Sequence, residues 1–194
     1  MISCFFPFPV VQCQQGGEIM NPVIENLLTR RSIRGFTHRP VAKEDLQTIV
    51  NTAIYAPSGM NRQTWQFTVI DHLPTIEHLA KVVGKADNRG EDYDFYKPTA
   101  VIIATNHRES RHGCADCSCA LQNIFLAAHS LGIGSVWINQ LNATCDNPEV
   151  RDLLTKVGIP TDHVVYGMAA LGYAALPPKE PNKNTQAICF YQPK

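Results

Sequence analysis

Basic side chains gather near the start of the chain, although its charges balance overall, with 17 lysines and arginines against 17 acidic residues. Residues 30–34 read RRSIR, and His38 and Arg39 follow shortly after. A guanidinium group can bind two oxygens of a phosphate or carboxylate, and a serine hydroxyl adds a hydrogen bond to the same anion. Cations are also common at helix C-termini, where the helix dipole favours them. The cluster is therefore either a local anion site or a solvated helix end.

A second segment offers amide side chains. Residues 56–65 read APSGMNRQTW, so a helical pattern ends at Pro57, and small and amide side chains precede a tryptophan. Asn61 and Gln63 each carry both hydrogen-bond donors and acceptors. Such groups suit the polar edge of a heterocycle, for example a flavin pyrimidine ring or a nicotinamide. Taken by itself, the pattern is also typical of an ordinary polar loop.

Three cysteines lie close together at Cys114, Cys117 and Cys119, and Cys145 follows at a distance. Thiolates at this spacing can in principle hold zinc or an iron–sulfur cluster. Cys117 and Cys119 fall inside a predicted helix, however, where residues two apart point in different directions. Free cysteine is also a common small core residue. We therefore predict no metal site and interpret the cysteines mainly as core residues.

Composition narrows the class of protein. With 194 residues, of which 44% are hydrophobic, the chain fits one domain with a sizeable core. Its formal net charge of zero argues against nucleic acid or an anionic membrane surface as a main partner. No apolar run approaches the roughly 20 residues of a membrane helix. An odd number of cysteines without a signal peptide favours reduced thiols, and we expect a cytoplasmic protein.

Hydrophobic periodicity and capping residues predict the elements that position these groups. Asn21 and Pro22 are typical of a helix start, and residues 43–56 repeat apolar side chains at helical spacing. The helix that Asp116 would cap is apolar nearly all round, as expected of a core or a dimer interface. Interspersed helices and strands without a repeat or linker predict one α+β domain. The remaining expected elements are helices at 75–83, 116–130 and 147–157, a polar loop at 85–97, and strands at 65–70, 101–104, 134–138, 164–173 and 187–191.

Residues 1–19 do not resemble the start of a domain. Their apolar stretch is broken by Pro7 and Pro9, and no basic residue precedes it, so a signal peptide is not predicted. The residues just before Met20 can be encoded by a bacterial ribosome-binding sequence upstream of a start codon. We therefore expect residues 1–19 to be a non-native or disordered leader, and residues 20–194 to be the domain.

The two motifs, in this order and at this spacing, resemble the FMN-dependent nitroreductase family. They read RRSIRGF at 30–36 and PSGMNRQTW at 57–65. The resemblance runs from about Met20 to about Lys183, nearly the whole chain. Further points of similarity are Gln122-Asn123, the sequence LGIG at 131–134 and Leu171-Gly172-Tyr173.

The chain departs from the family pattern in two places. Thr64 stands where the family usually has proline before the tryptophan, and the C-terminal basic stretch is reduced to Lys179 and Lys183. The long insertion of larger members is missing, so the chain resembles the compact branch of the family.

The resemblance implies a nitroreductase-like α+β fold, with a central, mostly antiparallel sheet flanked by helices, in an intertwined homodimer that binds FMN at its interface. It implies an enzyme that passes hydride from NADH or NADPH through flavin N5 to nitroaromatics, quinones or similar electron-poor acceptors by a ping-pong mechanism. The alternatives are a specialised flavin dehydrogenase or dehalogenase, or a non-catalytic flavin- or metal-binding protein.

The resemblance also implies a phosphate site. Arg30, Arg31 and Ser32 would hold the FMN phosphate and ribityl chain. Lys183, and after it Lys179, are the remaining candidates for contact with the phosphate.

The other implied contacts surround the flavin ring. Arg34 would lie near N1 and the C2 carbonyl, where a fixed cation stabilises developing negative charge, and no acid–base residue is required beyond the flavin. Gly134 and Ser135 would offer backbone contacts near N5. The loop residues that would reach the flavin from the other subunit are Pro57, Ser58, Asn61 and Gln63.

Overall fold

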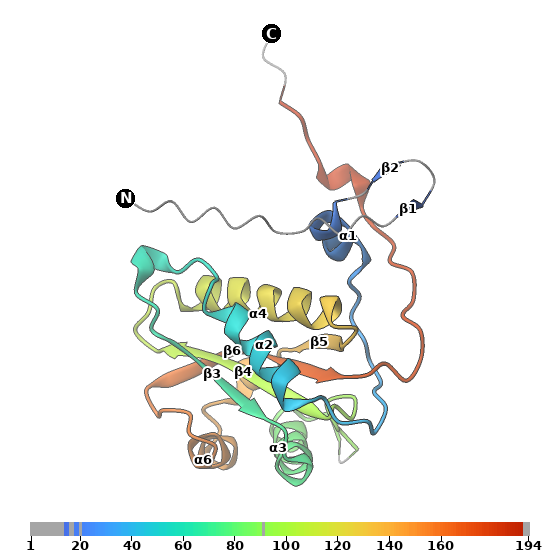
Figure 1. The fold of residues 1–194 in the computed structure, drawn as a ribbon. Coiled ribbons are helices and arrows are strands. Elements are labelled where there is room, and N and C mark those ends of the chain that lie inside the picture. Colours follow the sequence, from blue (N-terminus) through green and yellow to red (C-terminus); the bar gives the residue numbers. More distant parts are fainter. Residues whose placement is uncertain (1–13, 16–17, 20, 91, 192–194) are drawn as a thin grey trace.

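A four-stranded antiparallel sheet lies at the centre of the protein in a computed structural model, which describes residues 14–15, 18–19, 21–90 and 92–191 (Figure 1). The strand order is β3-β4-β6-β5. These strands are β3 (Trp65–Ile70), β4 (Ala100–His107), β5 (Gly134–Ile138) and β6 (His163–Gly172). Two short strands, β1 (Gln14–Gln15) and β2 (Glu18–Ile19), pair separately.

The sheet is covered on both faces because its central strand β4 is apolar on both sides. Val101 and Ile103 belong to one hydrophobic core, whereas Ile102 and Ala104 belong to a second. Successive side chains of a strand point to opposite faces, so one uninterrupted apolar run serves two cores.

Helices form a layer on each face of the sheet (Figure 1). The layer that shares a core with Ile102 contains α2 (Lys43–Ala53) and α4 (Gly113–Ser130). The layer that shares a core with Ile103 contains α3 (Leu73–Ala86), α5 (Gln140–Thr144) and α6 (Pro148–Lys156). The predicted α+β class and antiparallel sheet are therefore confirmed.

Several element boundaries differ from the prediction. Helix α4 begins three residues before Asp116, so Asp116 lies inside its first turn and does not cap it. Helix α3 continues through Gly84 to Ala86, because its buried face continues to Val83 and Gly84. Helix α5 was not predicted, since five residues are too few to show a period. The predicted strand at 187–191 is absent, and only a short 3-10 helix, η2 (Thr185–Ala187), precedes an extended stretch.

Helix α1 (Pro22–Thr29) forms as predicted, but it leaves its apolar side chains exposed. The side chain of its N-cap residue, Asn21, accepts a hydrogen bond from the Val23 amide at 2.9 Å. Val23 and Leu28 keep 66% and 60% of their surface exposed, and Ile24 and Leu27 keep 48% and 46%. A helix with four large apolar side chains in contact with water is typical of a surface that another chain covers.

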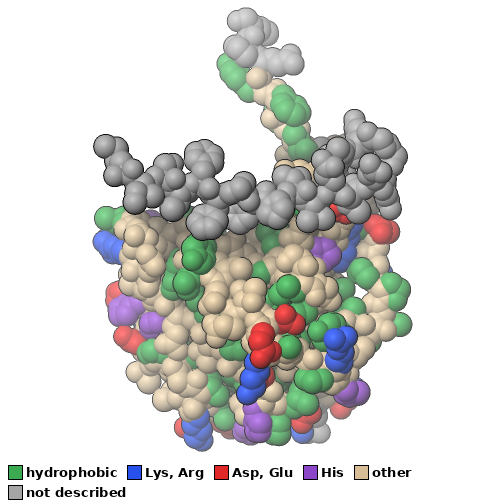
Figure 2. All heavy atoms as spheres, in the orientation of Figure 1, with side chains coloured by type: hydrophobic (Ala, Val, Ile, Leu, Met, Phe, Trp, Pro, Cys, Tyr) green, Lys and Arg blue, Asp and Glu red, His purple; other side chains and the backbone are tan. Residues whose placement is uncertain are grey.

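The C-terminal stretch also exposes apolar side chains. It projects from the body of the protein, and Figure 2 shows apolar side chains along it. Ile188, Phe190 and Tyr191 are each at least 68% exposed.

The described cysteines divide into two groups. Cys117 and Cys145 are buried, whereas Cys114, Cys119 and Cys189 are exposed, so the core interpretation is correct for two of them and wrong for three. Burial, with a smaller contribution from Asp116, raises the pKa of the Cys117 thiol to about 12. Within residues 14–15, 18–19, 21–90 and 92–191, no three His, Cys, Asp or Glu side chains are grouped so as to hold a metal ion.

Two further expectations concern the membrane and the N-terminus. No helix in the described part of the chain is long and apolar enough to cross a membrane. The predicted leader, residues 1–19, lies outside the described residues apart from β1 and β2, and it stays a prediction.

Candidate functional site

The basic segment, residues 31–35, is positioned by the end of the sheet at which β5 begins. Ser32 forms a parallel bridge to Ser135, and the Ile33 amide donates to the Ser135 carbonyl at 2.9 Å. Ile33 is buried in the core, whereas Ser32 and Arg34 are exposed. The segment therefore continues like a strand, with apolar side chains anchoring it and polar side chains on the outside.

The chain that follows β6 runs beside this segment. Phe36 forms an antiparallel bridge to Ala174, and the Ala175 amide donates to the Gly35 carbonyl at 3.1 Å. The proline-rich residues 175–181 consequently face the basic segment.

Between these two stretches lies a cavity of about 580 Å³. Its lining includes the cationic side chains of Arg31, Arg34 and Lys179 together with Ser32. This volume falls within the roughly 300–1,000 Å³ of small-molecule sites. The cavity therefore has the size and the positive charge that a moderately sized anionic ligand needs.

The Arg31 guanidinium is held in place by backbone carbonyls of the residues just before it. Its Nη1 atom donates to the carbonyls of Leu28 and Arg30, at 2.6 and 3.0 Å. Its Nη2 atom lies 3.6 Å from an oxygen of Glu180, a carboxylate that is 94% exposed. Arg31 thus presents a positioned cation whose partner is a weakly held surface acid.

Not every predicted phosphate ligand lies at this cavity. Arg30 is half-buried, and its guanidinium carbon lies 6.0 Å from the centre of the Phe125 ring. Burial, together with the charge of Arg31, lowers the pKa of Arg30. Neither Arg30 nor Lys183 is among the lining residues, whereas Lys179, the less favoured lysine, is.

Gly134 and Ser135 support the basic segment from behind. A Cβ atom at Gly134 would lie 2.8 Å from the Ile33 side chain and 3.1 Å from the Gly172 carbonyl, so the close packing requires glycine. Ser135 is buried, and its carbonyl accepts the hydrogen bond from the Ile33 amide. The predicted backbone contact near flavin N5 stays a prediction.

The amide loop, residues 57–63, lies at the opposite end of the sheet (Figure 1). The strand that follows the loop begins at Trp65, which pairs with Asn106 near the end of β4. The start of β4, Ala100, pairs with Leu171 beside the basic segment. At about 3.4 Å per residue, β4 separates the two ends by roughly 24 Å.

The backbone of the amide loop adopts an unusual conformation. Met60, Asn61 and Gln63 have φ angles of 57°, 55° and 49°. These angles lie in the left-handed region, which is unfavourable for most residues other than glycine. The exposed Gln63 amide donates to Asn61 Oδ1 at 2.7 Å. The Ser58 hydroxyl is buried, with no hydrogen-bond partner among the described residues. Within one chain, the loop therefore faces solvent and does not face the cavity.

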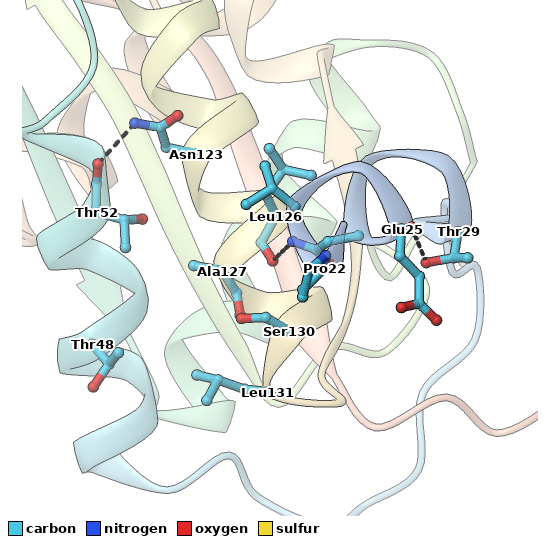
Figure 3. A pocket seen from close by; sticks show the side chains of 12 residues that line it. Pro22, Glu25, Thr29, Thr48, Thr52, Asn123, Leu126, Ala127, Ser130 and Leu131 are labelled. Carbon is cyan, nitrogen blue, oxygen red and sulfur yellow. Dashed lines mark hydrogen bonds between the residues drawn. The ribbon is translucent and has the colours of Figure 1, made fainter. Parts of the chain in front are cut away.

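A groove of about 760 Å³ lies between α1, α2 and α4 (Figure 3). Hydrogen bonds tie its walls together, from the Asn123 amide to the Thr52 carbonyl and from the Asn26 amide to the Leu126 carbonyl, each at 3.0 Å. Its lining is mostly small or apolar and borders the exposed side chains of α1. Glu25 is the one charged side chain among the described residues of its lining, so the groove has none of the cations of the first cavity.

Sequence reasoning missed two contributors to the site. They are the wall formed by residues 175–181, of which only Lys179 is a predicted site residue, and Glu180 beside Arg31. The sequence does carry a signal for this wall. Two prolines at 177–178 stiffen the backbone, and a lysine and a glutamate follow them directly.

Comparison with known proteins identifies the family of the chain. The model of the nitroreductase family matches residues 27–173. A relative from Archaeoglobus fulgidus, whose name pairs NADH dehydrogenase with NAD(P)H nitroreductase, is 33% identical over 158 residues, covering 79% of this chain and 86% of the relative. The FMN reductase [NAD(P)H] of Bacillus subtilis is 32% identical over 176 residues, covering 78% and 67%.

A solved structure extends the agreement to the fold. A nitroreductase with bound FMN from Bacteroides fragilis superposes with a TM-score of 0.83 at 36% identity, covering 89% of this chain and all of that one. The predicted nitroreductase-like fold is therefore confirmed. This chain belongs to the nitroreductase family.

Proposed function

We propose that the protein is an FMN-dependent oxidoreductase that uses NADH or NADPH to reduce nitroaromatics, quinones or similar electron-poor acceptors. The observation that carries the proposal is the cationic cavity, with Arg31, Ser32, Arg34 and Lys179 in its lining. The names of the relatives, nitroreductase and FMN reductase, support the same activity. The five described cysteines are all free, which suits the reducing cytoplasm that we propose as its location.

The residues of the cavity fit FMN. A phosphate monoester carries close to two negative charges, and the cavity offers two guanidinium groups, an ammonium group and a hydroxyl. The Glu180 carboxylate beside Arg31 is a native example of an anion at this guanidinium. The volume of about 580 Å³ is adequate for a cofactor of this size.

The protein contributes binding and electrostatics. Bound FMN supplies the transfer of a hydride equivalent from the nicotinamide to the acceptor. Two backbone carbonyls fix Arg31 before the phosphate binds, and the phosphate then replaces the exposed Glu180 carboxylate beside it. Arg34, exposed on the same strand-like segment, is the residue we assign to stabilise negative charge near flavin N1.

We further propose that the site is completed by a second copy of the chain. The amide loop and the cavity lie at opposite ends of the sheet, separated by β4, which is roughly 24 Å long, so the loop side chains cannot reach a ligand in the cavity of their own chain. A two-fold dimer would bring the loop of each chain to the cavity of its partner and create two identical sites. The exposed apolar side chains of α1 and the adjacent groove supply a surface for such an interface.

A flavin titration of the purified protein tests the proposal. We expect flavin absorption bands in the isolated protein, or tight FMN binding that quenches flavin fluorescence, followed by bleaching when NADH or NADPH is added. Because donor and acceptor would use one cleft in turn, initial rates should give the parallel lines of ping-pong kinetics. A protein that binds no FMN at micromolar concentration would rule out this function.

A further inference from the structure

The amide loop needs an external constraint to keep its shape. Its three left-handed residues, Met60, Asn61 and Gln63, have no glycine among them. Conformations of this kind persist only where the surrounding structure determines them. The groups that fix the ends of the loop therefore decide where the Asn61 and Gln63 amides point.

The first anchor is Asp116. This side chain is only 5% exposed, in the first turn of α4, and its Oδ1 atom accepts a hydrogen bond from the Gly59 amide at 2.9 Å. Gly59 also packs closely against the His112 ring, because a Cβ atom here would come within 2.4 Å of ring carbons. A buried carboxylate is costly unless hydrogen bonds compensate its lost hydration. Here the Gly59 amide, 57 residues away in sequence, supplies one.

The second anchor is Asn106, which is completely buried in β4. Its Oδ1 atom accepts a hydrogen bond from the Thr64 hydroxyl at 2.7 Å and another from the His107 amide at 2.8 Å. The loop is thus attached at Gly59 to a helix and at Thr64 to a strand. The strained residues lie between these two points.

We propose that Asp116 and Asn106 are positioning residues that hold the amide loop, through Gly59 and Thr64, in the conformation that presents Asn61 and Gln63 to the flavin of the partner chain. This proposal rests on the proposed function. It explains why a carboxylate is buried at the start of α4 although it caps no helix. It also explains why Thr64 takes the position before the tryptophan, where proline would lack the hydroxyl that Asn106 binds.

Hydrogen exchange of the ligand-free protein tests the anchors, and FMN titration tests their purpose. In Asp116→Ala we expect the amides of residues 59–63 to exchange about tenfold faster and FMN to bind about tenfold more weakly. Asp116→Asn keeps an acceptor at the same place and should restore both values to within about threefold of wild type. A merely structural role for Asp116 would change exchange throughout α4 and the sheet as well.

Ser118→Ala is the matched control. It removes a hydrogen bond within the same helix, from Ser118 Oγ to the Cys114 carbonyl, and leaves both anchors in place, so loop exchange and FMN affinity should stay unchanged. If Asp116→Ala fails to fold, Thr64→Val replaces it, because this variant breaks the second anchor at an exposed position. Faster loop exchange with weaker FMN binding in that variant would support the proposal.

The outcomes separate this inference from the proposed function. If the wild-type protein binds no FMN, the proposed function fails and the positioning role fails with it, while exchange still reports whether the anchors exist. If FMN binds, wild-type exchange at residues 59–63 in the anchor variants overturns the proposal. Faster exchange with unchanged FMN affinity also overturns it, because the loop shape would then not serve the flavin.

Discussion

The basic segment and the amide loop achieve local order by different physical means. Residues 31–35 are hydrogen-bonded between β5 and the chain after β6, and they face a cavity within their own chain. Residues 57–63 hold left-handed backbone angles through two side-chain anchors, and they face outward. In the arrangement that we propose, the first region binds an anion within its own chain, whereas the second acts on a ligand that a second chain holds.

The largest effect is expected from removing the positioned cation of the basic segment. Arg31→Ala should weaken FMN binding about 100-fold, since a bidentate, charge-assisted contact contributes roughly 3 kcal/mol. Arg30→Ala is the matched control, because the Arg30 guanidinium faces Phe125. This variant should weaken FMN binding no more than about threefold. Fluorescence titration of both variants measures the difference. Equal losses would mean that the cavity is not the phosphate site.

Arg34 lies on the same segment but should affect a different step. Arg34→Gln should slow reduction by NADH or NADPH about tenfold, while FMN affinity changes less, because the lost charge stabilises developing negative charge near N1. Stopped-flow bleaching of the flavin provides the rate. An unchanged reduction rate would refute this role for Arg34.

The amide loop should show a smaller effect, of another kind. Asn61→Ala should weaken FMN binding about fivefold, as expected for neutral hydrogen bonds of about 1 kcal/mol. Inorganic phosphate should compete with FMN equally well in this variant and in wild type, since the cation cluster is intact. If Asn61→Ala abolishes competition by phosphate, the assignment of the phosphate to the basic segment and of the flavin ring to the amide loop is wrong.

The smallest effect concerns the acid beside Arg31. Glu180→Gln should tighten FMN binding about twofold, because an exposed ion pair is worth at most about 1 kcal/mol and competes with the phosphate. The gain should disappear at high salt, which screens the competing charge. Weaker binding in this variant would indicate that Glu180 contacts the cofactor.

The elements of the fold could be predicted from the sequence wherever apolar residues recur at strand or helix spacing over enough positions. Strand β4 and helix α4 bury continuous or regularly spaced apolar residues, and both were expected. Residues 187–191 have the apolar side chains typical of a strand. Ile188 and Phe190 nevertheless have no strand beside them in the described structure. Periodicity indicates which residues prefer burial, but it does not say whether a partner is present.

The site was harder to predict, because tertiary contacts decide the direction of each side chain. Arg30 and Arg31 are adjacent in sequence, yet one guanidinium faces Phe125 and the other is fixed beside the cavity. Asp116 resembled a helix cap because acidic residues favour helix starts, but its partner is Gly59 in a distant loop. No local pattern carries that information.

A heterodimer tests most directly whether the site is shared between two chains. One chain carries Arg31→Ala, the other carries Asn61→Ala with Gln63→Ala, and two affinity tags select the mixed species. In a shared arrangement both changes fall in one site and leave the other intact, so the heterodimer should bind about one FMN with wild-type affinity. A heterodimer without any wild-type site would contradict the account, because each site would then be built from a single chain.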